Sequence, residues 1–203
     1  MLGLLTAFGL GYLIGAVPVA ALVARLRGVD IFSLGSGNMG AMNTATNLGY
    51  GYGALVLVLD LVKGALASGI GLVMVGAAGS SFETILPLAA AVGAVVGHAW
   101  SLYVKFRGGK ALATALGTSL PLFPLAGVYS LGLLIAMILM IRRVALASVM
   151  SLAVFPVVVY FNRIGQGIAT ETALTEAGGV ALIVSVIIVK HVRVGFAGDK
   201  PIF

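Results

Sequence analysis

A short polar segment stands out in a chain that is otherwise strongly apolar. The stretch SGNMGAMN begins at Ser36 and adds the amides of Asn38 and Asn43 to a set of small residues. Glycines such as Gly37 and Gly40 allow successive backbone N–H groups to point into one concavity, which suits a phosphate or a carboxylate. Serine and asparagine add hydrogen-bond donors without adding a charge. The segment therefore indicates an anion site, although the same composition is also typical of an ordinary connecting loop.

A second polar segment, GHAWSLYVKFRGGKALATALG, carries several cations. Lys105, Arg107 and Lys110 bracket the flexible pair Gly108 and Gly109, just ahead of a predicted helix. A helix N-terminus offers unpaired N–H groups and the positive end of the helix dipole, and neighbouring cations strengthen it as an anion site. The segment is not a P-loop, because G-x-x-x-x-G-K-[ST] is absent. The alternative is that these cations only anchor a helix end at the membrane surface.

Other ionisable and hydroxyl side chains lie in or next to apolar runs. Asp60 and Lys63 stand three residues apart in LDLVKG, so they share one face of a helix. Charges at membrane depth usually pair and face the bundle interior, so this pair fits either a polar site or an ion bridge that orients its helix. His98 is interpreted as an interior histidine that caps or bridges helices. Ser148 and His191 follow or accompany cations at predicted helix ends.

Several reaction classes lack the residues that they need. The chain has no cysteine, which excludes a disulfide, a thiolate metal site and a thiol nucleophile. H-E-x-x-H, G-x-S-x-G and the Rossmann fingerprint are absent, and neither histidine is followed by an aspartate four or five residues later. We therefore expect no metal and no cofactor. The net charge of +6 is placed along helix ends, which does not favour a nucleic-acid partner.

The composition of the rest of the chain predicts that these polar segments belong to a membrane protein. Of 203 residues, 61% are hydrophobic and 9% are charged, whereas soluble domains are about 25% charged. Runs of about 20 apolar residues cross about 30 Å of hydrocarbon. Such apolar runs lie at 2–24, 51–78, 85–104, 111–124, 125–141, 144–161 and 178–192. We predict an all-α integral membrane protein with about seven transmembrane helices, residues 1–203 forming a single transmembrane domain whose first helix is retained.

The basic residues predict how these helices are oriented. With the N-terminus outside, ten of the twelve lysines and arginines fall on one face, and such an excess marks the cytoplasm. The C-terminus is then cytoplasmic. The fourth run is short and contains Pro121 and Pro124, so its helix is expected to be truncated or bent, and a count of six helices would reverse part of the topology. On this topology residues 30–49, residues 97–118 and the tail from Lys190 converge at one membrane face.

The motifs together resemble one known family. SGNMGAMN, LDLVKG, GH…FRGGKALAT and a C-terminal H…R…GDK occur in the order and at the distances found in the bacterial acyl-phosphate:glycerol-3-phosphate acyltransferases, the PlsY family. The resemblance covers nearly the whole chain. It implies transfer of an acyl chain from acyl-phosphate to the 1-hydroxyl of glycerol 3-phosphate, which gives lysophosphatidic acid for phospholipid biosynthesis. It further implies a multi-pass protein of the bacterial inner membrane, expected to act as a monomer.

The resemblance also implies which residues form the site. We place four residues in catalytic roles: Ser36, Asn38, Lys110 and His191. Substrate binding is assigned to Gly37, Gly40, Asn43, Thr46, Lys105, Arg107, Gly108, Gly109 and Ser148, with Asp60, Lys63 and His98 as supporting polar residues. Because an acyl-phosphate is already activated, no covalent nucleophile is required. Orientation of the hydroxyl and stabilisation of the developing oxyanion could supply most of the acceleration, with a substrate phosphate oxygen as a possible base.

The chain departs from the family pattern at several positions. Thr46 stands where the family has an arginine, Ala111 where it has a glycine, and Ala145 where it has a serine, while the shortened tail has Asp199 in place of an Asn and a Glu. Loss of an arginine removes a bidentate phosphate donor. Three functions stay open: the acyltransferase, a catalytically altered member that binds lipid phosphate, and a small membrane transporter or binding protein for a phosphorylated solute or lipid. The sequence does not specify the acyl-chain preference or whether acyl-CoA is excluded as donor.

Overall fold

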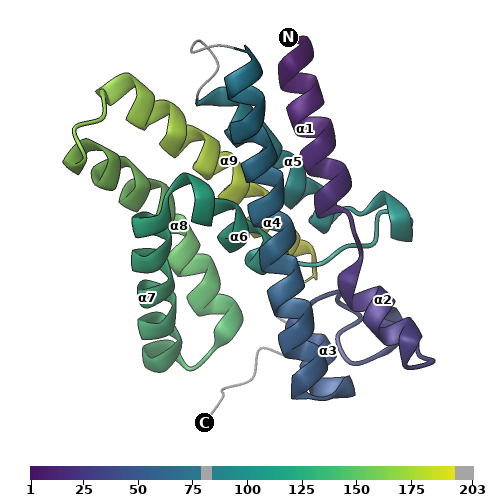
Figure 1. Ribbon diagram of the computed structural model, residues 1–203. Helices are drawn as coiled ribbons and strands as arrows, with labels where there is room; N and C mark the ends of the chain where they lie inside the picture. The colour runs from purple at the N-terminus through teal and green to yellow at the C-terminus, as the bar shows by residue number, and fades with distance from the viewer. Residues whose placement is uncertain (79–83, 195–203) are drawn as a thin grey trace.

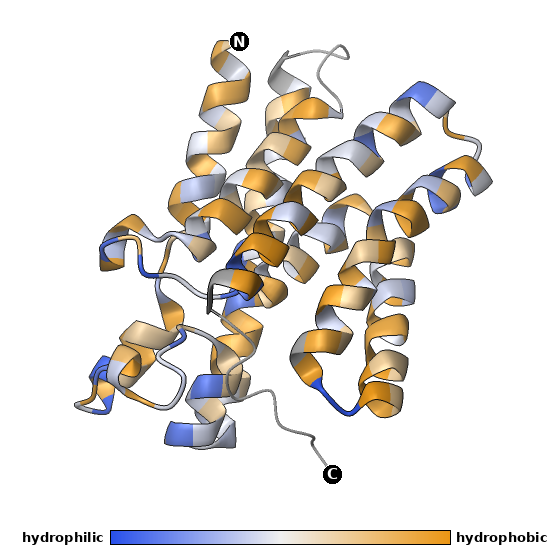
Figure 2. Cartoon of the chain, turned by 180° about the vertical axis from the view of Figure 1, so that it is seen from behind, coloured by the Kyte–Doolittle hydropathy of each residue, from blue (hydrophilic) through white to orange (hydrophobic). Residues whose placement is uncertain are grey.

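The protein is a bundle of helices. The computed structural model describes residues 1–78 and 84–194, and all regular elements in these residues are helical, as predicted (Figure 1). Their bounds are α1 (Leu2–Gly15), α2 (Val19–Leu26), η1 (Ile31–Ser33), α3 (Ala41–Leu48), α4 (Tyr50–Ala78), α5 (Ile85–Ala99), η3 (Leu102–Val104), α6 (Leu112–Leu122), α7 (Pro124–Ile141), α8 (Val144–Gly165) and α9 (Thr170–Val194). The long helices expose mainly apolar side chains, and the most hydrophilic segments lie in turns such as the one between α7 and α8 (Figure 2).

Among the described residues, six segments are long and apolar enough to cross a membrane. They are Leu2–Leu26, Tyr50–Gly76, Ile85–Val104, Pro124–Ile141, Leu146–Gly165 and Thr170–Val192. The fourth predicted run instead forms α6, an apolar helix of 11 residues, which at a rise of about 1.5 Å per residue is about half as long as the hydrocarbon layer is thick. The prediction of about seven spans thus corresponds to six full-length segments and one half-length helix.

The two ends of the bundle consist of different segments of the chain. The N-terminus of α1 lies at one end, and α3 and the turn between α7 and α8 lie at the other (Figure 1). The predicted topology likewise places the N-terminus on one membrane face, and residues 30–49 and the turn between α7 and α8 on the opposite face. Which end faces the cytoplasm stays a prediction from the distribution of lysines and arginines.

Three boundaries differ from those predicted. The first run is divided between α1 and α2 at Pro18, which has no N–H to continue the helix. The polar loop predicted at 30–49 contains η1 and α3. The last helix begins at Thr170 rather than near 178, and its early residue Glu176 is buried and pairs with Arg163 (2.7 Å).

Glycines bring α1 and α5 into direct backbone contact. A Cβ added at Gly11 or Gly15 would come within 3.0 Å of the backbone of α5, and one at Gly93 or Gly97 would come equally close to the backbone of α1. Small residues at such contacts are what allow helices to pack tightly in a membrane. These glycines are therefore packing positions where α1 crosses α5.

Two further hydrogen bonds fix the end of α5 against α1. The Tyr12 hydroxyl donates to the carbonyl of Trp100 (2.8 Å), and the buried Ser101 hydroxyl donates to the carbonyl of Ala16. The other partner of this region is α6, which packs on α4 where Gly64 meets the backbone of Thr114. The segment that follows α5 is thus held between α1, α4 and α6.

Candidate active site

The polar loop ahead of α3 is shaped by one buried side chain, Asn43. Its Nδ2 donates to the carbonyl oxygens of Leu34 (3.1 Å) and Asn38 (3.0 Å), and its Oδ1 accepts the N–H of Ser36 (3.1 Å). Gly37 has a left-handed φ of +63°, which glycine adopts without strain. Both ends of the Asn43 amide are used within the loop, so its contribution here is to hold the loop in shape.

Asn38 is the residue of this loop with a polar atom left over. Its Oδ1 is buried and has no hydrogen-bond partner among the residues that the structure describes. A buried polar atom without a partner is costly and calls for an explanation. Ser36, two residues earlier, is exposed. The loop therefore combines an exposed hydroxyl with a buried amide oxygen that has no partner among the described residues.

The FRGGK segment lies directly against this loop. Gly109 of this segment lies between the loop and α5, because an added Cβ would come within 3.0 Å of both the Met39 carbonyl oxygen and the His98 ring. The guanidinium of Arg107 lies 4.0 Å from the centre of the Phe32 ring, which is a cation–π contact. Two segments about 70 residues apart in the chain are therefore brought together as the sequence predicted.

The start of α6 adds backbone donors to the same region. The hydrogen bond from the Ala115 N–H to the Ala111 carbonyl (2.9 Å) marks the first helical turn, so the N–H groups before residue 115 are not used within the helix. Lys110, which is half-buried, directly precedes this turn. Ala111 has a left-handed φ of 60°, a conformation that favours the glycine found there in the family.

A buried polar network lies behind the diglycine turn. Lys63 Nζ is 2.7 Å from Asp60 Oδ1 and donates to the Val17 carbonyl (3.0 Å). His98 Nδ1 is 3.6 Å from the same Asp60 oxygen and 3.1 Å from the Thr114 hydroxyl. The side chains of Asp60, Lys63, His98 and Thr114 are all buried. The predicted inward-facing ion pair and the predicted interior histidine are thus confirmed as structural features.

The end of α9 reaches the same region. Lys190 Nζ donates to the Ala99 carbonyl at the end of α5 (2.7 Å) and lies 5.3 Å from the centre of the Trp100 ring. His191 is buried, and its Nδ1 lies 3.0 Å from the Ile187 carbonyl. The two contacts of Lys190 join the last turns of α9 to the C-terminal end of α5.

One hydrophobic cluster joins α5, α9 and the first residues of α6. Ile187 of α9 and Ala111 are members of it, and Leu152 of α8 packs against it. Ser148 stands one turn before Leu152, is buried, and donates to the Val144 carbonyl (2.7 Å). Ser148 and His191 are therefore each one helical turn from a residue that belongs to this cluster or packs against it.

Two sequence-based expectations are not joined to this region by any described contact. Thr46 is exposed on α3, and its hydroxyl donates to the carbonyl of Met42 (3.0 Å) within its own helix. Asp199 lies outside the described residues. In residues 1–78 and 84–194, no three His, Cys, Asp or Glu side chains gather closely enough to hold a metal ion.

Three residues at the site had no predicted role. Phe32 makes the cation–π contact with Arg107, Met39 contacts Gly109 through its carbonyl, and Thr114 contacts His98. Thr114 lies in the first turn of α6, two residues after the helix begins at Leu112. No sequence motif indicated its contact with His98.

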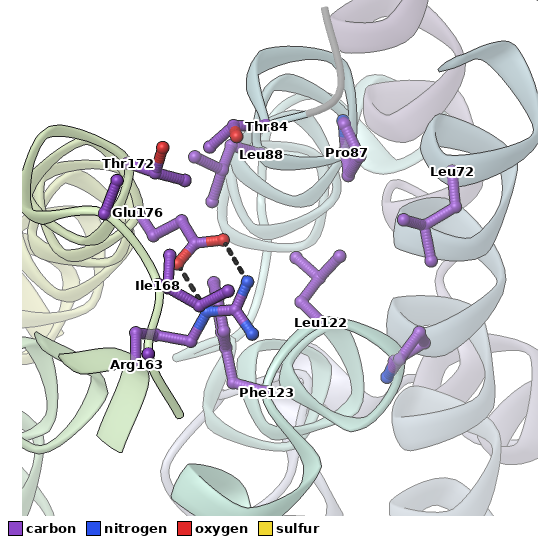
Figure 3. Close-up of a pocket in the computed structure, with 13 residues that line it drawn as sticks. Leu72, Thr84, Pro87, Leu88, Leu122, Phe123, Arg163, Ile168, Thr172 and Glu176 are labelled. Carbon is purple, nitrogen blue, oxygen red and sulfur yellow. Dashed lines mark hydrogen bonds and ion pairs between the residues drawn. The ribbon is translucent and has the colours of Figure 1, made fainter. Parts of the chain in front are cut away.

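A separate cavity lies elsewhere in the bundle. It has a volume of about 410 Å³ and is lined by residues that include Thr84, Leu122 and Thr172. Figure 3 shows the Arg163 guanidinium bound to both Glu176 oxygens in it, through Nε (2.7 Å) and Nη2 (2.9 Å). Because the Arg163 guanidinium also donates to Gln166 Oε1 (3.0 Å), its hydrogen bonds are made within the protein, and we interpret the ion pair as a link between α8 and α9.

Comparison with known proteins identifies the family. A family profile described as glycerol-3-phosphate acyltransferase matches residues 5–194. The chain belongs to this glycerol-3-phosphate acyltransferase family. The resemblance inferred from its motifs is thereby confirmed, and the acyltransferase is favoured over a transporter.

Curated relatives and solved structures agree with this membership. Glycerol-3-phosphate acyltransferase 2 of Moorella thermoacetica is 39% identical over 161 residues, 78% of this chain and 79% of that protein. The glycerol-3-phosphate acyltransferase of Salinibacter ruber is 36% identical over 195 residues, 90% of this chain and 83% of that protein. The crystal structure of PlsY (YgiH), an integral membrane glycerol 3-phosphate acyltransferase, in its glycerol 3-phosphate form superimposes with a TM-score of 0.76 at 29% identity, over 94% of this chain and 88% of that chain. Its lysophosphatidic acid form gives a TM-score of 0.75. This family member is thus an integral protein of the bacterial inner membrane.

Proposed function

We propose that this chain transfers an acyl group from an acyl-phosphate to the 1-hydroxyl of glycerol 3-phosphate. The products are lysophosphatidic acid and inorganic phosphate. One observation carries the proposal: the SGNMG loop and the FRGGK turn contact each other through Met39 and Gly109, with Arg107 over Phe32. Two segments that each favour a phosphate thereby form one site, and both substrates of this reaction are phosphorylated.

The charges at this site suit anionic substrates. Lys63 is balanced by Asp60, to which it is bonded at 2.7 Å. The positive charges of Lys105, Arg107 and Lys110 come in addition to that neutral pair. Backbone N–H groups at the start of α6 add the positive end of a helix dipole. Two phosphates can therefore approach the site without the repulsion that they would exert on each other in isolation.

The reaction needs orientation and charge stabilisation more than a strong nucleophile on the protein. The 1-hydroxyl oxygen of glycerol 3-phosphate attacks the acyl carbonyl carbon, the carbon–oxygen bond to phosphate breaks, and the hydroxyl proton passes to a phosphate oxygen. We place Lys110 and the N–H groups of the α6 start at the oxyanion and the departing phosphate. Ser36 and the unpaired Asn38 Oδ1 would hold the attacking hydroxyl.

The remaining candidates take supporting roles in this proposal. Gly37, Gly40 and Gly108 shape the two segments: Gly37 adopts a left-handed φ, Gly40 lies against the Asn38 side chain, and Gly108 lies against the backbone of His98 and Ala99. Asn43 shapes the loop through its bonds to Ser36 and Asn38. Ser148 on α8 and His191 on α9 would contact the phosphate of one substrate. We propose that a single chain suffices for activity, since all these residues belong to one bundle.

The decisive experiment supplies purified protein in detergent with palmitoyl-phosphate and labelled glycerol 3-phosphate. Lysophosphatidic acid should form, and Lys110→Ala should remove most of the activity. A parallel reaction with palmitoyl-CoA identifies the donor, and product from the thioester alone would contradict the acyl-phosphate assignment. If no product forms with either donor while Lys110→Ala still weakens phosphate binding, the chain is a catalytically altered member of the family.

A further inference from the structure

The diglycine turn packs on the buried side chain of His98, which has no role in the proposed function. Gly108 and Gly109 contact His98 through both its backbone and its ring. The Gly109 N–H donates to the His98 carbonyl (3.1 Å), and the edge of the ring that carries Nε2 faces Gly109. The ring therefore packs directly against Gly109, the residue that precedes Lys110.

The other edge of the same ring is held from two sides. His98 Nδ1 lies 3.1 Å from the Thr114 hydroxyl on α6 and 3.6 Å from Asp60 Oδ1 on α4. Asp60 is in turn fixed by Lys63 (2.7 Å), which donates to the Val17 carbonyl where α1 ends. Three helices thus set the position of one imidazole ring.

Ionisable side chains inside a membrane protein are costly and therefore point to a purpose beyond helix association. Close backbone packing is already supplied at these interfaces by glycines, at Gly64 between α4 and α6 and at Gly97 between α5 and α1. Polar groups that add little to packing can still define one orientation, because their hydrogen bonds are directional. Here the oriented group is in direct contact with the diglycine turn.

We infer that His98 is a positioning residue which, held by Thr114 and Asp60, fixes the Gly108–Lys110 turn for phosphate binding. The inference rests on the proposed function for the meaning of that turn, but the support itself is a property of the protein without substrates. Loss of the Thr114 hydroxyl should release the ring, and the turn above it should become mobile while the helices remain packed.

Thr114→Val tests this with little change of shape, since valine replaces the hydroxyl by a methyl group. Thr114→Ser is the matched control, because it keeps the hydroxyl and loses the methyl. Hydrogen exchange of the substrate-free protein in detergent, followed by mass spectrometry of peptides, measures the support directly. We expect exchange in the segment from Gly108 to Ala113 to rise at least tenfold in Thr114→Val and to change less than twofold in Thr114→Ser.

Activity provides the second measurement. The value of kcat/KM for glycerol 3-phosphate should fall about tenfold in Thr114→Val, since misplacing binding groups by about 1 Å costs up to about 100-fold, and Thr114→Ser should restore it. Unchanged exchange in Thr114→Val, or a rise spread evenly along α5 and α6, would overturn the inference.

A second variant protects the test if Thr114→Val does not fold. His98→Asn keeps an amide near Thr114 and removes the ring edge beneath Gly109, so it should produce the same local rise in exchange. The same absence of a local rise would count against the inference. If the wild-type protein makes no lysophosphatidic acid yet exchange responds as expected, the proposed function fails and the support stands.

Discussion

Gly109→Ala probes the contact between the two polar segments at its tightest point. An added Cβ would lie about 1 Å inside the 3.4 Å at which ordinary contact begins, on both the His98 side and the Met39 side. Gly109 is not among the residues with positive φ, so alanine meets no backbone penalty and the effect is steric alone. The loop and the turn must then separate by roughly 1 Å, a displacement that costs about 100-fold in rate.

That loss corresponds to about 2.7 kcal/mol of transition-state stabilisation. We expect the free energy of unfolding to fall by about 1–3 kcal/mol, as is usual for overpacking, so the variant should remain folded enough to assay. Purified protein is compared for kcat/KM with palmitoyl-phosphate and glycerol 3-phosphate, and for thermal unfolding in the same detergent. Gly69→Ala on α4 is the control, because a Cβ there meets nothing within 4 Å. A Gly109→Ala enzyme that keeps more than one third of the wild-type kcat/KM would refute the argument that this contact sets the site.

Three further predictions concern other parts of the chain. Thr46→Arg should raise kcat/KM for glycerol 3-phosphate at least threefold without changing thermal stability, since Thr46 is exposed; an unchanged value would show that Thr46 does not weaken the phosphate site. Asp60→Asn should lower the free energy of unfolding by about 3 kcal/mol by leaving a buried lysine unpaired. Adding Lys63→Met should recover part of that loss, and equal instability of the single and double variants in detergent denaturation would contradict the assignment of a buried pair. Gly15→Val should prevent assembly of a monodisperse bundle, because even one Cβ there overlaps the backbone of α5, whereas Gly9→Ala should not; size-exclusion chromatography separates these outcomes.

The sequence predicted the parts of the fold that depend on local composition. Apolar runs predicted where the long helices lie, and the three-residue spacing of Asp60 and Lys63 predicted their ion pair. Contacts between distant segments were harder to predict. The contact of Thr114 with His98 depends on how deeply α6 packs against α4, and that depth is set by Gly64 and its neighbours. No local pattern contains that information.

Asn43 shows a different limit of sequence reasoning. An asparagine in a glycine-rich loop is predicted to offer its amide to a ligand, because it has donors and acceptors and no charge. In the structure the amide is bonded to Ser36, Leu34 and Asn38 of its own loop. A loop that must fold around few apolar side chains competes with any ligand for such groups. Asn38 differs only by position, and its Oδ1 is the buried atom left without a partner among the described residues.

The departures from the family pattern act on different properties of the site. Ala111 holds a left-handed backbone conformation that costs an L-residue about 1–2 kcal/mol, so this change affects geometry and stability but not charge. Thr46 removes a charge and leaves the backbone of α3 intact. Arg107, stacked on Phe32, already supplies one guanidinium beside the segments that we propose bind phosphate. An arginine at position 46 would therefore add to an existing cation rather than create the first one, which is why the expected gain is a few-fold and not the 100-fold that separates a formed site from a broken one.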